Sequence, residues 1–201
     1  MFVKICGITR PADAVDAVDA GADAIGLNFV PESRRRVDLA QAHAILAATP
    51  PHVMTVGVFR DHSAGEILGI ARELGLDSAQ LHGDDYTSAI AARVQTVILA
   101  MAAEDVALRS LDEHPAGIVM LDGPAPGSRV PVDWTTVGDL VTEHRILLAG
   151  GLRPDNVDDT IRHVRPWGVD VASSVDATPG HKDPAAMTRF VTQAPKAATK
   201  P

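Results

Sequence analysis

The sequence predicts an α/β protein folded as a single-domain (β/α)₈ TIM barrel, in which eight parallel strands form a closed ring inside a layer of helices. Short apolar runs alternate with Ala- and Leu-rich amphipathic stretches along the 201 residues. This alternation is typical of parallel strands joined by crossover helices. Eight such units leave about 25 residues each, the compact limit of this barrel. An open doubly wound sheet is the alternative, but its usual G-x-G-x-x-G turn is missing from KICGITR at 4–10.

The strands are predicted from apolar runs that are rich in β-branched residues and bounded by Gly, Pro or Asp. In chain order they occupy 2–6, 22–29, 53–59, 77–81, 96–101, 117–122, 145–150 and 168–173. No stretch between them is long enough to be a linker, so we expect the barrel to cover residues 1–194. Residues 195–201, which follow the last apolar pattern, are expected to form a loosely held tail.

The helices are predicted from apolar residues at helical spacing between these runs. Helix 11–20 begins with Pro11 and helix 154–165 with Pro154, and proline suits the first position of a helix. The other predicted helices occupy 38–48, 63–74, 85–93, 104–113, 134–143 and 183–193.

Composition excludes several classes of protein. The 18 Lys and Arg against 26 Asp and Glu give a net charge of −8, which argues against binding nucleic acid or an anionic membrane. No apolar run is long enough to span a membrane, and the start MFVKICGITR does not resemble a signal peptide. The single cysteine cannot form an internal disulfide or a cysteine-based metal site. We expect a cytoplasmic, soluble protein, and the net charge does not exclude an anionic small-molecule ligand, because distant charges are screened.

In such a barrel, functional groups lie at the carboxyl ends of the strands and in the loops that follow. This rule selects a small set of candidates: Cys6, the run Arg34–Arg36, His82, Asp122, Gly150, Gly151, Asp170, Ser173 and Ser174. The eight histidines show no metal-ligand spacing, so no metal site is predicted.

Cys6 and Asp122 are the candidates for proton transfer. Taken alone, Cys6 is more often a small buried apolar residue, and Asp122 equally often a turn cap. Together they place a thiol and a carboxyl at one mouth, as acid–base chemistry requires. Lys4 shares a strand face with Cys6 and supplies a neighbouring charge.

The loops after the last two strands are the candidates for anion binding. Gly150 and Gly151 follow the seventh strand, and Ser173 and Ser174 the eighth, where barrels bind phosphate through backbone N–H groups. Simple turn chemistry is the alternative for these four residues. The arginine run and His82 are each interpreted either as surface residues or as contributors of one ligand.

Seven segments together resemble the phosphoribosylanthranilate isomerase family of tryptophan biosynthesis. They run in the family's order from the start of the chain to about residue 190: KICGIT (4–9), GADAIGLNFVPESRR (21–35), VGVF (56–59), AQLHGDD (79–85), MLD (120–122), LAGGLRPDNV (148–157) and GVDVASSVDATPGHKD (168–183).

The resemblance implies a (β/α)₈ barrel that catalyses a cofactor-free Amadori rearrangement, an aldose–ketose isomerisation classed as an intramolecular oxidoreduction. It implies that Cys6 is the general base and Asp122 the general acid. It further implies that Arg35 lies beside the anthranilate and that Asp170 binds sugar hydroxyls, with His82 as a further substrate contact. The same matches assign Gly150, Gly151, Ser173 and Ser174 to the phosphate. Monomer and homodimer are both compatible with the family.

The chain departs from the family pattern at three positions. Ser174 stands where a glycine approaches the phosphate, Arg129 replaces a glycine after the sixth strand, and Asn28 replaces an apolar residue. At Ser174 a positive φ would be costly, whereas the hydroxyl offers an added donor. Two other functions are weighed: a sister isomerase of the histidine-pathway type, which uses an early aspartate where this chain has Cys6, and a non-catalytic barrel that binds a phosphorylated ligand.

Overall fold

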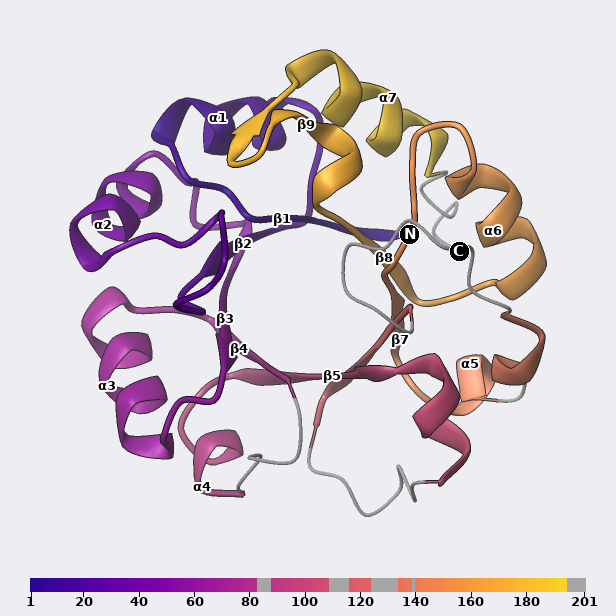
Figure 1. The fold of residues 1–201 in the computed structure, drawn as a ribbon, viewed down its shortest axis with the longest axis horizontal. Coiled ribbons are helices and arrows are strands. Elements are labelled where there is room, and N and C mark those ends of the chain that lie inside the picture. The colour runs from indigo at the N-terminus through magenta and orange to yellow at the C-terminus, as the bar shows by residue number, and fades with distance from the viewer. Residues whose placement is uncertain (83–87, 109–115, 124–133, 139, 195–201) are drawn as a thin grey trace.

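The eight predicted strands form a closed parallel barrel in chain order, surrounded by helices (Figure 1). The computed structural model describes residues 1–82, 88–108, 116–123, 134–138 and 140–194. The strands are β1 (Phe2–Cys6), β2 (Ala24–Asn28), β3 (Met54–Arg60), β4 (Ser78–His82), β5 (Thr96–Ala102), β6 (Ile118–Asp122), β7 (Ile146–Leu148) and β8 (Gly168–Val171). The fold class is therefore as the sequence predicts, while the predicted tail 195–201 lies outside the described residues.

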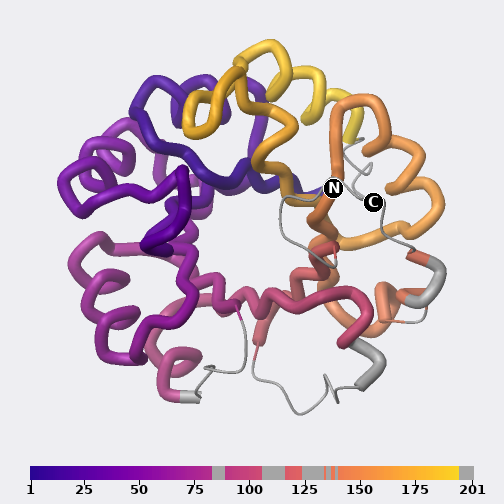
Figure 2. Tube along the Cα trace, in the orientation of Figure 1, coloured from indigo at the N-terminus to yellow at the C-terminus, as the bar shows by residue number. Residues whose placement is uncertain are grey.

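Helical segments lie outside the ring and return the chain to the start of the next strand (Figure 2). The α-helices are α1 (Pro11–Asp19), α2 (Leu39–Ala47), α3 (Ala64–Leu74), α4 (Ser88–Ala91), α5 (Leu140–Glu143), α6 (Val157–Val164) and α7 (Pro184–Gln193). The short 3₁₀ segments are η1 (Ala103–Leu108), η2 (Trp134–Val137) and η3 (Ser173–Val175). Asp38 and Ser63 begin α2 and α3 with capping boxes, in which side chain and backbone satisfy each other's unpaired groups.

Two predicted helices differ in the structure. The segment 104–113 contains the 3₁₀ helix η1, and its remainder lies outside the described residues. The segment 134–143 is divided into η2 and the one-turn α5, with Gly138, a poor helix former, between them. For the prediction 85–93, the described part is the single turn α4.

The predicted start of helix 154–165 is also wrong, because α6 begins at Val157. Asn156 accounts for the difference. Its side chain accepts a hydrogen bond from the Arg153 backbone N–H at 2.7 Å and donates one to the Gly151 carbonyl at 3.0 Å. These local bonds compete with helical ones and hold a turn around Pro154.

The sequence analysis did not predict the two-stranded antiparallel hairpin between β8 and α7. It consists of β9 (Asp176–Thr178) and β10 (His181–Lys182), joined through Gly180 at φ +85°. The hairpin lies over α1 at the rim of the barrel (Figure 1), where the Thr9 hydroxyl donates to the Gly180 carbonyl. The Pro-Gly dipeptide at 179–180 was the available turn signal.

The alternation of side chains along the strands creates two apolar layers. Outward-facing residues pack against the helices, whereas the inward-facing ones fill the lower barrel with a smaller cluster: Ala24, Val56, Ile98, Ala100, Ile118, Met120, Leu147 and Ala149. Toward the carboxyl ends the inward side chains become polar. The interior of the barrel is therefore apolar, and the polar side chains lie above it at the carboxyl ends of the strands.

Candidate active site

The carboxyl ends of the strands surround a cavity of about 480 Å³. Its walls come from seven of the eight strand ends and their loops, and they include every site residue that the sequence nominated by role: Cys6, Arg35, His82, Asp122, Gly150, Gly151, Asp170, Ser173 and Ser174. Cys6 and Ser174, 168 positions apart in the chain, thus lie around one cavity because parallel strands all end on the same side of the barrel.

Cys6 ends β1 and faces into the barrel beside a buried ion pair. Lys4 and Asp170 are register partners on β1 and β8, and Lys4 Nζ lies 2.7 Å from Asp170 Oδ1. Burial raises the pKa of the Cys6 thiol, and the charge of Lys4 opposes that rise. Gly26 leaves room for the thiol, since a Cβ there would lie 2.8 Å from Sγ. The thiolate that a base requires would form next to the Lys4 ammonium.

Asp122 ends β6 and faces the same cavity. Its Oδ1 accepts a hydrogen bond from the Gly123 backbone N–H at 2.8 Å. Burial raises the pKa of this carboxyl, the direction that suits a proton donor. Gly150 packs directly against it: φ is +75°, and a Cβ would lie 2.6 Å from Asp122 Oδ1 and press on the Gly123 nitrogen.

This contact predicts that Gly150→Ala lowers kcat by about 10²-fold, because a displaced carboxyl would misalign the proton transfer that the sequence predicts for Asp122. The measurement is steady-state turnover of the variant beside that of Gly65→Ala. Gly65 lies in α3 and a Cβ there meets nothing within 4 Å, so this control should keep full activity. Equal activity of the two variants would contradict a role for Gly150 in placing Asp122.

His82 ends β4 and lines the cavity in its neutral form, because burial lowers its pKa to about 4. Its Nε2 lies 3.0 Å from Gln80 Nε2, one inward position earlier on the strand. Gln80 Oε1 is buried without a hydrogen-bond partner, although the side chain lines the cavity. Sequence reasoning missed Gln80, and its signal was an amide within an apolar strand.

Two predicted substrate-binding residues are held by partners of the opposite charge. Asp170 pairs with Lys4, and Arg35 donates from Nε and Nη2 to Asp176 Oδ2 at 2.8 and 2.5 Å. Of the arginine run, Arg34 and Arg35 line the cavity, whereas Arg36 does not. Fixing a charged side chain in this way removes much of the entropy that it would lose on binding a ligand.

The two candidate phosphate loops lie side by side at the mouth. Gly150 and Gly151 have φ of +75° and +69°, and Ser173 begins η3. Ser174 Oγ donates to the Leu152 carbonyl at 2.5 Å and joins the two loops. The expected strain at Ser174 does not arise, since Asp61 and Arg165 are the non-glycine residues with positive φ in the described part of the chain. The replacement Arg129 lies outside the described residues, whereas Asn28 lines the cavity.

No described group of three or more His, Cys, Asp or Glu side chains is arranged to hold a metal ion. Similarly, none of the helices in the described ranges is both long and apolar enough to cross a membrane.

The chain is similar in sequence to one family of known proteins. A family model described as N-(5′-phosphoribosyl)anthranilate (PRA) isomerase matches residues 3–193. The chain is 40% identical over 210 residues to the N-(5′-phosphoribosyl)anthranilate isomerase of Chlorobaculum tepidum, covering 97% of this chain and 95% of that protein. It is 43% identical over 199 residues to the Myxococcus xanthus protein of the same name, covering 94% and 93%.

Solved structures give the same result. The phosphoribosyl anthranilate isomerase from Thermus thermophilus superposes with a TM-score of 0.88 at 37% identity, covering 96% of this chain and 98% of that one. An isomerase complexed with reduced 1-(o-carboxyphenylamino)-1-deoxyribulose 5-phosphate has a TM-score of 0.86 at 36% identity and the same coverage. A third structure contains monomers generated from the dimeric Thermotoga maritima enzyme, with a TM-score of 0.85, 35% identity and again that coverage.

Proposed function

The chain belongs to the N-(5′-phosphoribosyl)anthranilate isomerase family, and on that premise we propose that Cys6 and Asp122 perform its chemistry. The activity is the isomerisation of N-(5′-phosphoribosyl)anthranilate in tryptophan biosynthesis. The observation that carries the proposal is the meeting of a thiol from β1 and a carboxyl from β6 at one cavity. The family match decides against the sister isomerase and the non-catalytic barrel.

Asp122 begins the reaction by donating its proton to the furanose ring oxygen. The nitrogen lone pair forms a C1=N bond as the C1–O bond breaks, which opens the ring to a Schiff base. The Cys6 thiolate then removes the C2 proton. The electrons of the C2–H bond form a C1=C2 bond while the C1=N π pair returns to nitrogen, which gives an enolamine. The C2 hydroxyl loses its proton while C1 gains one, which yields the ketone. The net movement of one proton from Asp122 to Cys6 is reversed before the next turnover.

The rest of the cavity binds and orients the substrate. Arg35 binds the anthranilate carboxylate, and Asp170 with His82 contacts the sugar hydroxyls. The backbone N–H groups at Gly150, Gly151, Ser173 and Ser174 hold the phosphate. This assignment is compatible with the net charge of −8. Exposed charges that lie farther from the phosphate than a Debye length of about 10 Å are largely screened, so they do not prevent anion binding at this site. A cytoplasmic location, a monomeric or dimeric state and the lack of a nucleic-acid partner are part of this proposal.

The test is turnover of N-(5′-phosphoribosyl)anthranilate by the purified chain, followed through the fluorescence of the anthranilate group. We expect turnover that is unchanged by a metal chelator, because the proposed steps need only the thiol and the carboxyl. Absence of turnover by folded protein would overturn the proposal. Turnover that the chelator abolishes would overturn the cofactor-free mechanism.

We predict a bell-shaped pH profile of kcat/KM to which His82 contributes no limb near neutral pH. Activity falls on the acid side when Asp122 and Cys6 are both protonated, and on the alkaline side when both are ionised. Burial raises the pKa of both groups, so both limbs lie at higher pH than for the free side chains. His82 adds no limb at neutral pH because its pKa is about 4. A neutral limb that disappears in His82→Gln would contradict this.

A further inference from the structure

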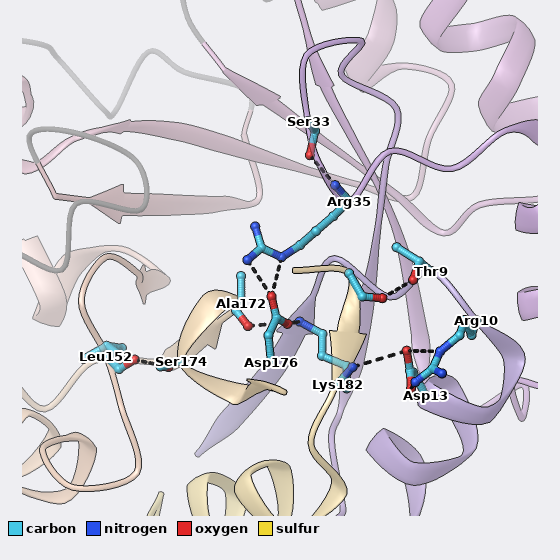
Figure 3. A network of polar contacts seen from close by, with 11 residues as sticks. Thr9, Arg10, Asp13, Ser33, Arg35, Leu152, Ala172, Ser174, Asp176 and Lys182 are labelled. Carbon is cyan, nitrogen blue, oxygen red and sulfur yellow. Dashed lines mark hydrogen bonds and ion pairs between the residues drawn. The ribbon is translucent and has the colours of Figure 1, made fainter. Parts of the chain in front are cut away.

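Asp176, the first residue of β9, is shared by two cations from distant parts of the chain (Figure 3). Its Oδ2 accepts from Arg35 in the loop after β2, and its Oδ1 lies 2.7 Å from Lys182 Nζ on β10. The Asp176 and Lys182 side chains are 5% and 0% exposed, whereas the Arg35 side chain is 22% exposed at the cavity. The buried Asp176 and Lys182 therefore support Arg35, which a substrate in the cavity can reach.

Arg35 is fixed along its whole length. Its backbone N–H donates to Ser33 Oγ at 3.1 Å, and its aliphatic stem crosses Gly7, where a Cβ would collide with Arg35 Cδ. Gly7 follows Cys6 directly and has φ +75°. The aliphatic stem of Arg35 is thus held beside the residue after the proposed base, and the bonds to Asp176 set the orientation of the guanidinium.

Lys182 connects this arginine with the phosphate side of the cavity. Its Nζ donates a second hydrogen bond, of 3.0 Å, to the carbonyl of Ala172, the residue before Ser173. The hairpin that carries it is tied down by the bond from Thr9 to Gly180 (Figure 3). One ammonium group therefore braces both the carboxylate that orients Arg35 and the backbone that enters the phosphate loop.

The charges of the three side chains explain why a second cation is needed. Arg35 and Asp176 alone would cancel, and a neutral pair attracts an anion weakly. With Lys182 included, the cluster keeps a net charge of +1, which faces the cavity through Arg35. The substrate carries a carboxylate and a phosphate, so a preserved positive charge favours its binding.

We propose that Lys182 is a positioning residue for substrate binding, which offsets the charge of Asp176 so that Arg35 remains an effective cation and which fixes the carbonyl before the phosphate loop. The proposal rests on the proposed role of Arg35 in binding the anthranilate carboxylate. Lys182 acts through its neighbours, since it does not line the cavity and is itself wholly buried.

The test compares KM and kcat in Lys182→Met, Lys182→Arg and the double variant Asp176→Asn/Lys182→Met. In Lys182→Met the cluster becomes neutral, and we expect KM to rise about tenfold. We expect a smaller fall in kcat, because the charge of Lys182 also opposes the rise in the pKa of the Cys6 thiol. Lys182→Arg keeps the charge and should restore most of the affinity. The double variant removes both buried charges and leaves Arg35 unopposed, so its KM should fall below that of Lys182→Met. The matched control is Arg162→Met, which removes a cation from an exposed ion pair with Asp158 on α6.

A purely structural role for Lys182 predicts that the double variant has a higher KM than Lys182→Met. It also predicts that kcat falls in step with the amount of folded protein. That order of KM values would overturn the proposal, as would an unchanged KM in Lys182→Met. Binding of anthranilate alone, titrated by its fluorescence, gives a second readout. It should weaken in Lys182→Met whether or not the wild-type protein turns over substrate, so failure of this inference is distinguishable from failure of the proposed function.

Discussion

Replacing Cys6 by serine is expected to lower kcat by about 10³-fold or more, roughly 4 kcal/mol of transition-state stabilisation. The serine hydroxyl is nearly isosteric, so the variant keeps the packing of the thiol against β2. Its pKa is far above that of a thiol, so it provides almost no anion to remove the C2 proton. The same burial that raises the pKa of Cys6 raises the cost of any anion at this position.

The measurement is single-turnover and steady-state kinetics of Cys6→Ser beside Cys6→Ala, with thermal unfolding of both as the folding control. We expect the two variants to be about equally slow, because neither provides a base, and KM to change little. A loss below tenfold in the serine variant would remove Cys6 from the role of base. A loss that follows a lower melting temperature would indicate a packing role instead.

The barrel, and the residues at the carboxyl ends of its strands, were predictable because both depend on local sequence patterns. Each strand–helix unit is encoded by adjacent residues, and the rule that parallel strands end on one side then places Cys6, Asp122 and the glycine pair together. The short connections were harder to predict. A single poor helix former, Gly138, divides one expected helix, and the side chain of Asn156 shortens another.

The supporting contacts could not be predicted from sequence, because they join residues far apart in the chain. Arg35 and Asp176 are 141 positions apart, and Lys4 and Asp170 are 166 positions apart. Neither member of a pair carries a local signal of its partner, and the pairing follows only from strand register and from the hairpin that the pattern did not reveal. The resemblance assigned Arg35 and Asp170 to the substrate, but not the partners that fix them.

Asp122→Asn is expected to lower kcat by about 10³-fold, comparably to the cysteine variant. The amide has the same shape, and its oxygen still accepts the hydrogen bond from the Gly123 backbone N–H. It also fits against Gly150, so the walls of the cavity are expected to stay in place. What the variant lacks is a carboxyl proton for the furanose ring oxygen, so ring opening becomes the slow step.

Asp61→Asn is the matched control, because Asp61 is another carboxyl that lines the cavity, in the loop after β3. Its φ is +59°, a backbone conformation that asparagine also tolerates well. This variant removes one negative charge from the cavity, as Asp122→Asn does, but removes no proposed proton donor. We therefore expect near-normal kcat in Asp61→Asn and a loss of about 10³ in Asp122→Asn. Equal losses would mean that the cavity's charge rather than a positioned acid governs the rate, and near-normal turnover in Asp122→Asn would remove Asp122 from the mechanism.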